Sequence, residues 1–445
     1  MINSRESWRS RLGFIMATTG SAVGLGNIWR FPTTVGRNGG GAFVLVYLVI
    51  VVLIGVTAMI AEFALGRRTR QSPVGAFRAL GPRRWWMAGA LSVVAVFIIL
   101  SFYSVIAGWT AAYVVKYWTG ALTGLDAAGL ETEFSRLVAD PLRPLFWHFI
   151  FMVVTALVIA RGVTGGIERW AKVLMPGILI LLLLLLLRVI QLPGAVAGMA
   201  WLIRPDLARI NFGTLLEATG QVFFSFSLGM GIMITYGSYL DESDNIPQSA
   251  VIIAGADVAV ALLAGLIVIP AVFAFNMEPG LGPALVFVTI PAVFNSLPAG
   301  WLFGGAFFLM LSFAALTTTF SLLEVVVALI IDEWHWSRPL ATAVAAAAIF
   351  LLGIPSALSQ GQPGIGFFGA SFLDNMDFLS SNVLLPISGI LTAVFVGWVW
   401  GARGAAAELQ TEGHRFSLAG VWLLLLRYLV PLAIAAVMIG RLFFG

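Results

Sequence analysis

The stretch Gly20-Ser21-Ala22-Val23-Gly24-Leu25-Gly26-Asn27-Ile28-Trp29-Arg30-Phe31-Pro32 decides the fold, because it interrupts an apolar segment with glycines and polar residues. That segment covers residues 12–35 approximately, which is long enough to cross a bilayer. Glycine carries the largest entropic cost in a helix, so its repetition here predicts an unwound backbone. Unwound backbone at membrane depth is tolerated only where protein buries it or a watery cavity adjoins it. Its free carbonyls can then bind a cation, and the following half-helix offers N–H groups to an anion.

The alternative is a glycine-kinked helix that packs closely on a neighbouring helix, as small residues allow in membranes. Asn27 and Arg30 argue against this alternative, because polar groups buried at membrane depth usually serve a function. We therefore expect a binding site at the break.

This string, together with Asn38-Gly39-Gly40-Gly41-Ala42-Phe43 after it, closely resembles the first-helix signature of the neurotransmitter:sodium symporter family. Other segments resemble their counterparts in its bacterial amino-acid transporter branch, so the likeness covers nearly the whole chain. The resemblance implies an all-α integral membrane protein with a LeuT-like 5+5 inverted repeat, discontinuous helices 1 and 6, and one extra helix.

The composition independently indicates a membrane protein. The chain has 445 residues, of which 60% are hydrophobic and 10% are charged, whereas ordinary soluble domains carry about 25% charge. The net charge of +4 does not indicate a nucleic-acid partner, because the basic residues lie in short loops. The sequence has no Cys, which excludes disulfides and thiolate metal sites, and its three scattered His disfavour zinc. The first apolar segment carries the motif, so we expect no cleaved signal peptide.

Apolar run lengths predict eleven spans within a single transporter domain, residues 1–445. The predicted spans are approximately 12–35, 41–66, 88–117, 145–160, 168–190, 213–240, 248–276, 299–331, 339–358, 375–402 and 418–443. The connecting loops are short except for 118–144 and 191–212, which we expect at the outer interface. Segment 280–298 is apolar but interrupted by Gly and Pro, which predicts a re-entrant or lid loop.

A second broken helix is predicted at Ser225-Phe226-Ser227-Leu228-Gly229-Met230-Gly231, in the sixth span. It holds the same place in spans 6–10 (about 213–402) as the opening stretch holds in spans 1–5 (about 12–190), and helix 11 (about 418–443) follows. Paired interruptions in two five-span halves indicate inverted repeats around a binding site at the membrane midplane.

The basic residues predict the orientation of the chain. Lys and Arg are more frequent in the loops that would lie on the same side of the membrane as the N-terminus. Examples are Arg67, Arg68, Arg70, Arg83 and Arg84. The positive-inside rule therefore places the N-terminus in the cytoplasm, and an odd number of spans places the C-terminus outside. We expect a multi-pass protein of the bacterial inner membrane, in contact with lipid.

Polar atoms recur at membrane depth in three further spans. Tyr103 lies mid-span, where it is either a buried hydroxyl donor or an interfacial aromatic. Asp257 lies between apolar runs and predicts a functional carboxylate, with pairing to an unseen base as the alternative. Thr317 and Thr318 share a helix face with the Ala314 carbonyl. These hard oxygens suit an alkali cation, although hydroxyls that bond back to their own helix are the alternative.

The family resemblance implies two Na⁺ sites. The first would use the Ala22 carbonyl, the side chains of Asn27, Ser225 and Asp257, and the carboxylate of the substrate. The second would use the carbonyls of Gly20, Val23 and Ala314 and the hydroxyls of Thr317 and Thr318.

The resemblance also implies a substrate pocket, two gates and a hinge. The pocket would be formed by Ala22, Gly24, Gly26, Ile99, Tyr103, Phe224, Ser227, Met230, Thr318 and Leu322, with Tyr103 bonding the substrate carboxylate. The outer gate would be Arg30 with Asp377, which lies near Asp374 at the outer end of span 10. The inner gate would be Arg5, Trp8, Ser238, Tyr239 and Asp332. A hinge in span 5 would use Gly166 and Pro176.

Three departures from the family pattern matter. Eleven spans replace the twelve of many relatives, which leaves the dimer interface and the oligomeric state open. Glu324 stands near the inner gate where an amide is expected. Asp257 replaces a commoner Asn, with Ala261 one turn later.

Chloride-dependent relatives bind the anion with residues matched here by Tyr47, Gln221 and Ser225. A fixed Asp257 carboxylate beside the same sodium would repel that anion, so no chloride requirement is expected.

The sequence therefore predicts a sodium-coupled symporter that imports hydrophobic and aromatic L-amino acids by alternating access. A channel would need a continuous polar stripe without paired gates. A membrane enzyme would need a nucleophile with a base, and no His or Cys accompanies the polar cluster. An amino-acid sensor that keeps the binding site but does not transport remains the alternative.

Overall fold

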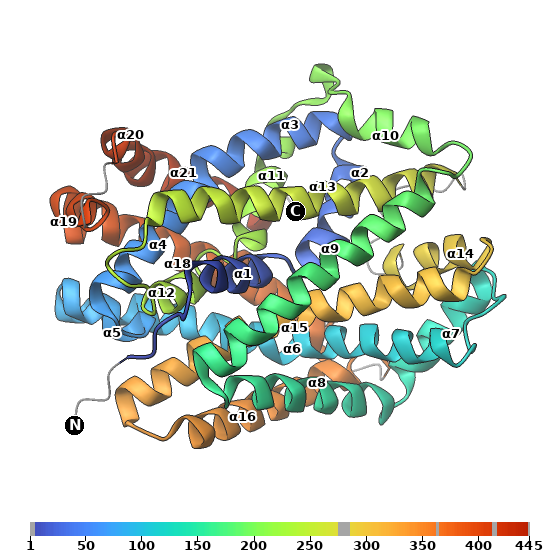
Figure 1. Cartoon of the computed structure of the whole chain (residues 1–445), viewed down its shortest axis with the longest axis horizontal. Coiled ribbons are helices and arrows are strands. Elements are labelled where there is room, and N and C mark those ends of the chain that lie inside the picture. The colour runs from blue at the N-terminus through green and yellow to red at the C-terminus, as the bar shows by residue number, and fades with distance from the viewer. Residues whose placement is uncertain (1–4, 275–284, 362–364, 412–415, 444–445) are drawn as a thin grey trace.

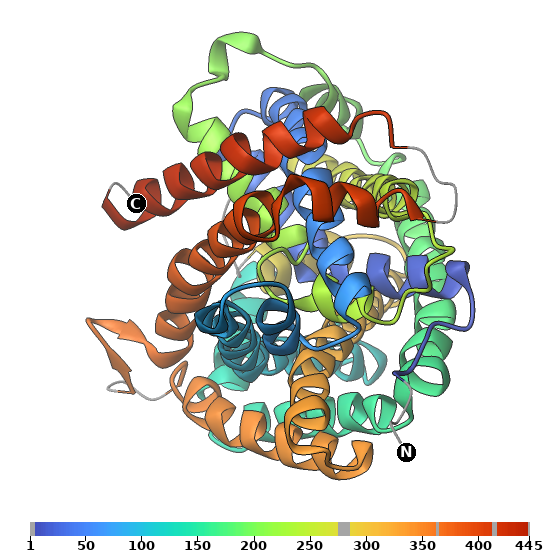
Figure 2. The ribbon, with the colours of Figure 1, turned by 90° about the vertical axis from the view of Figure 1, so that its left-hand side faces the viewer.

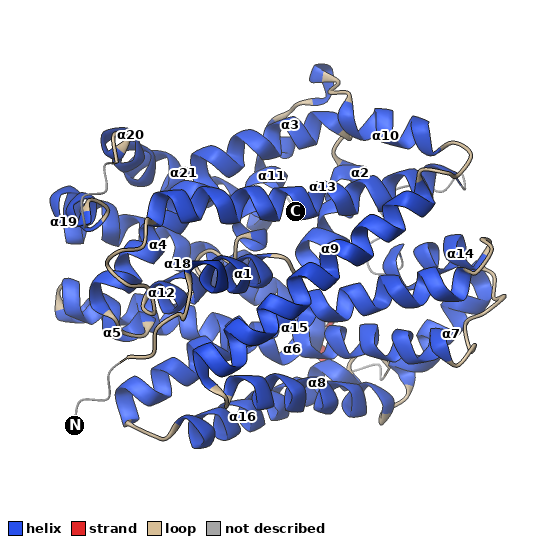
Figure 3. Ribbon diagram, in the orientation of Figure 1, coloured by secondary structure: helices blue, strands red, loops and turns tan. Residues whose placement is uncertain are grey.

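The computed structural model describes residues 5–274, 285–361, 365–411 and 416–443. Nearly all of these residues are helical (Figure 3). Strands β1 (Gly366–Phe367) and β2 (Ala370–Ser371) form a two-stranded antiparallel hairpin, which is the only sheet in the described part of the chain. The all-α prediction is confirmed.

The long helices run side by side along one axis, with the two broken helices among them (Figures 1 and 2). The described spans are Gly41–Thr69 (α3, Gly41–Ile50, and α4, Val56–Thr69), Arg83–Trp118 (α6, Trp86–Trp118), Val163–Val189 (α9, Arg169–Val189), α13 (Ile246–Ala274), α15 (Gly300–Trp334), α16 (Arg338–Leu358), Phe372–Gly401 (α17, Phe372–Leu379, and α18, Leu385–Val394) and Ala419–Phe443 (α20, Ala419–Leu424, and α21, Val430–Phe443). These are the eight described helices that are long and apolar enough to cross a membrane. α8 (Arg143–Ile159) matches a ninth predicted span.

The first broken helix consists of α1 (Arg11–Ala22), a π-helical turn (Gly26–Arg30) and α2 (Phe31–Arg37). The second consists of α11 (Phe212–Ser225) and α12 (Ile232–Gly237). Both interruptions fall at the glycines that predicted them. Their halves are too short to count as spans alone, and the total of eleven crossings stays a prediction.

The two long loops contain helices that the sequence did not reveal. α7 (Ala127–Ala139) meets α8 at 74°, and α10 (Ala195–Ile203) packs on α13. α7 and α10 lie at the end of the bundle opposite the N-terminus, as expected for outer loops (Figure 1). In segment 280–298, residues 280–284 lie outside the described residues, and the rest includes a short apolar helix, Leu285–Asn295, that contains α14 (Ile290–Asn295).

The remaining helices lie at the N-terminal end of the bundle. They are α5 (Pro73–Leu80) and α19 (Ala402–Glu408) (Figure 1). α15 packs along α6 and α9, and α1 packs on α15, α9 and α13. α12 packs on α4 and α15, so protein surrounds both broken helices, as unwound backbone at membrane depth requires.

Candidate substrate and ion site

A cavity of about 340 Å³ lies where the two broken helices meet α6 and α15. All ten residues of the predicted substrate pocket line it, together with two serines that were assigned no pocket role: Ser21, Ala22, Gly24, Gly26, Ile99, Tyr103, Phe224, Ser225, Ser227, Met230, Thr318 and Leu322. The lining is mostly apolar, with a few polar groups that converge on the two helix breaks, as is usual in small-molecule sites.

Tyr103 points its hydroxyl at the first break. The hydroxyl oxygen accepts a hydrogen bond from the Leu25 N–H at 3.2 Å, and the side chain is buried. This excludes the interfacial-aromatic alternative and leaves the hydroxyl proton available to a ligand. A Cβ atom at Gly24 would lie 2.6 Å from Thr318 Oγ1 and 3.0 Å from Tyr103 Oη, so the close approach requires glycine.

The second break is held in an unusual backbone conformation. Ser227 has φ +52°, and Gly229 and Gly231 have φ +72° and +69°. Glycine adopts positive φ readily, but a side-chain-bearing residue there is strained, and such strain is concentrated at functional sites. The strain therefore falls on Ser227, a residue that lines the cavity.

A buried oxygen-rich cluster borders the cavity. The Asn27 amide donates to Asp257 Oδ1 at 2.8 Å, and the Ser225 hydroxyl donates to Asp257 Oδ2 at 2.9 Å. Ser225 Oγ also lies 3.2 Å from Asn27 Oδ1. No basic side chain pairs with Asp257 among the described residues, so the ion-pair alternative is not supported. The structure thus brings together all three side chains predicted for the first sodium.

The second predicted cation cluster is also assembled. Thr317 Oγ1 and Thr318 Oγ1 lie 2.9 and 3.2 Å from the Ala314 carbonyl oxygen, as the back-bonding alternative expects. Thr318 Oγ1 also lies 3.3 Å from the Ser21 carbonyl oxygen across the helix interface. A Cβ atom at Gly20 would lie 3.1 Å from Thr317 Cβ, so the last turns of α1 pack closely on this part of α15. The proximity fits a shared ligand set, and the sodium role stays a prediction.

Residues matched to the anion site of chloride-dependent relatives surround the first cluster. Tyr47 Oη lies 3.5 Å from Asp257 Oδ2, and the Gln221 amide donates to the Gly26 carbonyl at 3.1 Å. Asp257 therefore occupies the neighbourhood in which the mobile anion was expected, and Ala261 adds no hydroxyl.

The residues predicted for the inner gate contact one another. Arg5 pairs with Asp332 at 2.5 Å and donates to the Ser238 hydroxyl at 2.8 Å, while its guanidinium lies 4.9 Å from the centre of the Tyr239 ring. Trp8 is buried beside them and donates to the Tyr236 carbonyl at 3.0 Å, so all five predicted residues meet. The gating role stays a prediction.

Glu324 belongs to this inner cluster, and the sequence did not predict its partners. It is fully buried, pairs with Arg338 at 2.8 Å and accepts a hydrogen bond from the Tyr239 hydroxyl at 2.5 Å. Arg338 also pairs with Glu6 at 2.7 Å. An acid here, in place of an amide, therefore joins the N-terminal segment to α15 and α16.

We expect Glu324→Gln to open the inner side more often, because breaking a buried ion pair costs several kcal/mol. The natural absence of cysteine allows a single reporter, Tyr236→Cys, beneath Trp8. Labelling of this cysteine should accelerate at least about tenfold, equivalent to about 1.4 kcal/mol. Glu333→Gln, which breaks a more exposed pair with Arg78, is the control and should leave the rate unchanged. Equal rates in both variants would contradict the gating role of Glu324.

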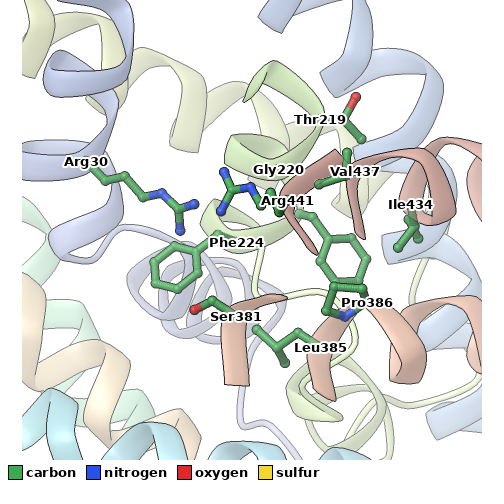
Figure 4. A pocket seen from close by; sticks show the side chains of 11 residues that line it. Arg30, Thr219, Gly220, Phe224, Ser381, Leu385, Pro386, Ile434, Val437 and Arg441 are labelled. Carbon is green, nitrogen blue, oxygen red and sulfur yellow. The ribbon is translucent and has the colours of Figure 1, made fainter. Parts of the chain in front are cut away.

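The outer gate is not paired in this structure. The Arg30 guanidinium lies 4.6 Å from the centre of the Phe224 ring and points toward Arg441 across a cavity of about 370 Å³ (Figure 4). Asp377 instead accepts from the Ser381 hydroxyl at 2.9 Å, and no Arg30–Asp377 ion pair occurs among the described residues. In this structure the residues predicted for the inner gate are therefore paired, whereas the pair predicted for the outer gate is not.

Asp377→Ala should lower uptake by about tenfold, because it removes the partner that Arg30 needs when the outer path closes. Asp374→Ala is the matched control, since Asp374 is occupied as the acceptor of the Ser371 hydroxyl at 2.6 Å. Initial uptake rates of both variants give the comparison. Equal losses would remove the reason for choosing Asp377.

Both residues of the proposed hinge lie in helical backbone in this structure. Gly166 lies in a π-helical turn, Val163–Glu168, and a Cβ atom there would lie 2.0 Å from the Val158 carbonyl oxygen. Pro176 lies inside the following helix, α9. The glycine is required by close packing in this conformation, and its role as a hinge stays a prediction.

Glu62, a buried carboxyl in α4, was not predicted as a site residue from the sequence. It accepts a hydrogen bond from the Gly229 N–H at 2.8 Å and so contacts the second break directly. An acid inside an apolar run could have indicated a functional residue. However, Glu62 lies close to Arg67 and Arg68, and charged residues there indicate the end of a span.

Comparison with known proteins now identifies the class. The family model for the sodium:neurotransmitter symporter family matches residues 5–127 and 140–443. The chain belongs to this family, and it is therefore a sodium-coupled transporter and not an enzyme.

Similar proteins occur in bacteria. The chain is 42% identical to the uncharacterised sodium-dependent transporter YhdH of Bacillus subtilis over 97% of both chains. It is 34% identical to an uncharacterised sodium-dependent transporter of Haemophilus influenzae over 99% of this chain and 98% of that one. The crystal structure of MhsT in complex with L-phenylalanine matches with a TM-score of 0.90 and 45% identity, covering 98% of this chain and 99% of MhsT. The LeuT-like fold is confirmed.

Proposed function

We propose that this protein imports hydrophobic and aromatic L-amino acids with two Na⁺ ions by alternating access, without a chloride requirement. One observation carries the proposal. At the break of the first helix, a mostly apolar cavity adjoins the Tyr103 hydroxyl, whose proton is available to a ligand. The buried cluster of Asn27, Ser225 and Asp257 lies at the same break. The L-phenylalanine bound to MhsT supports the substrate class. The N-terminus would lie in the cytoplasm of a bacterium and the C-terminus outside.

The residues divide the work of binding between the two ends of an amino acid. The Tyr103 hydroxyl, which accepts from Leu25, can donate to the substrate carboxylate. That carboxylate would complete the oxygen shell of the first sodium beside Asn27 and Asp257. Each ligand then favours the binding of the other, which is the reciprocal coupling that symport requires. Moving two charges inward contributes about 4–5 kcal/mol per ~100 mV, enough to concentrate a neutral zwitterion.

The cavity wall selects the substrate side chain. Ile99, Phe224, Met230 and Leu322 provide apolar surface, and Met is the most adaptable of these side chains. Gly24 places no acid at the break, so an amine without a carboxylate finds no counter-charge there.

Competition assays should therefore rank hydrophobic and aromatic L-amino acids first. Discrimination among them should be loose, because one methylene is worth only about 1–3 kcal/mol in a hydrophobic pocket. Inhibition of labelled L-phenylalanine uptake by unlabelled amino acids gives the ranking, with L-glutamate, L-lysine and dopamine as controls. Stronger inhibition by any of these three would refute the proposed substrate class.

A non-transporting sensor is the second candidate, since it would keep the same cavity. The paired inner gate and unpaired outer gate favour transport, because a sensor has no need of gates at both ends.

A further inference from the structure

Glu62 has a half-satisfied carboxyl group in the interior of the bundle. Glu62 is only 2% exposed, and its Oε1 accepts a hydrogen bond from the Gly229 N–H at 2.8 Å. Oε2 is buried and has no hydrogen-bond partner among the described residues. Buried polar atoms are nearly always paired, so a carboxyl oxygen without a partner requires an explanation.

Oε2 belongs to a side chain that borders a separate cavity of about 200 Å³, away from the substrate site. The cavity is lined by Ala58, Ala61, Glu62, Phe223, Gly389, Thr392, Ala393 and Leu426. Glu62 is the only titratable side chain of this lining, which α4, α11, α18 and the turn Leu425–Leu429 provide.

No basic group of these elements pairs with Glu62, because Arg67 and Arg68 of α4 both pair with Glu408. Arg427 follows Leu426 on the same turn, but it donates to the Gly397 carbonyl at 2.7 Å and lies 5.2 Å from the centre of the Trp398 ring. The Thr392 hydroxyl is occupied with the Ser388 carbonyl at 2.9 Å. Glu62 and Thr392 are the only polar side chains of this lining, which are too few to replace the hydration shell of a metal cation.

An ionised carboxylate without a counter-charge is expensive in such a place, and one backbone N–H does not offset that cost. Protonation of Oε2 removes the charge at no cost in space. We propose that Glu62 is a proton-binding site, neutral in this conformation and linked to the second break through Gly229. Release would transfer the proton from Oε2 to water that enters the cavity, leaving a carboxylate.

The link to transport is short. Gly229 lies between Ser227 and Met230, which line the substrate cavity, so a rearrangement there changes the partner of Glu62. Linkage requires the reverse as well: loss of the proton alters the energy of the break. This consequence rests on the proposed function, whereas the proton site itself does not.

Infrared spectroscopy of the purified full-length protein tests the site without any substrate. The difference spectrum between wild type and Glu62→Gln at neutral pH should contain the carbonyl stretch of a protonated carboxyl group. Glu324→Gln is the control, because Glu324 is ion-paired with Arg338, and it should remove only ionised-carboxylate bands. Glu62→Asp, which keeps the acid, should shift the protonated band without removing it. If Glu62→Gln removes only ionised-carboxylate bands from the wild-type spectrum, the proposal is wrong, whether or not the protein transports phenylalanine.

Discussion

Replacing Thr317 and Thr318 together by Val is expected to abolish sodium-dependent substrate binding. The exchange keeps the volume of each side chain but removes two hydroxyl oxygens where α15 packs on the end of α1. Hydrogen bonds to charged groups contribute about 1.5–3 kcal/mol each, so two lost ion ligands predict at least about a hundredfold loss of sodium affinity. Binding of labelled L-phenylalanine over a series of sodium concentrations measures the effect.

Two controls separate ion binding from other effects. Thr319→Val removes a hydroxyl that bonds Leu316 and Thr155, away from the break, and should leave sodium dependence unchanged. Thr317→Val alone spares the substrate cavity, which Thr318 lines, and should still weaken sodium binding. If the double variant kept wild-type sodium dependence, both hydroxyls would serve only their own helix.

The second large effect concerns Asp257 and chloride. Wild-type uptake should be the same in gluconate and in chloride, because the fixed carboxylate supplies the negative charge beside the first sodium. Asp257→Asn should lower sodium affinity by about tenfold or more, since a charge-assisted interaction is lost. Chloride should restore part of that affinity, bound near Tyr47, Gln221 and Ser225.

Asp206→Asn is a suitable control, because Asp206 is exposed and pairs with Arg209 in an outer loop. Uptake by Asp206→Asn should equal that of the wild type, and it should be the same in gluconate and in chloride. A several-fold loss of wild-type uptake in gluconate would mean that Asp257 does not stand in for the anion.

The parts of the fold that depend on backbone chemistry were predictable from the sequence. Glycine repeats marked both helix breaks, and apolar run length gave spans whose ends differ from the structure by a few residues. The substrate cavity was also predicted, because the family resemblance supplied all ten residues that the structure brings together.

The parts that depend on tertiary partners were not predictable. α7 and α10 are short helices in loops, where no bilayer-length signal exists. The Glu324–Arg338 pair joins separate helices, and run length says nothing about which buried acid meets which base. Glu62 was missed for the same reason, because only its contact with Gly229 distinguishes it from a charge at a span end.

Uptake of labelled L-phenylalanine into proteoliposomes tests the central claim most directly. Purified protein is reconstituted in chloride-free buffer, and uptake is compared with an inward sodium gradient, with equal sodium on both sides and with potassium replacing sodium. We expect accumulation above equilibrium only with the inward sodium gradient, and its loss in the Thr317→Val, Thr318→Val double variant. Binding of phenylalanine without accumulation under any gradient would contradict symport and favour the sensor.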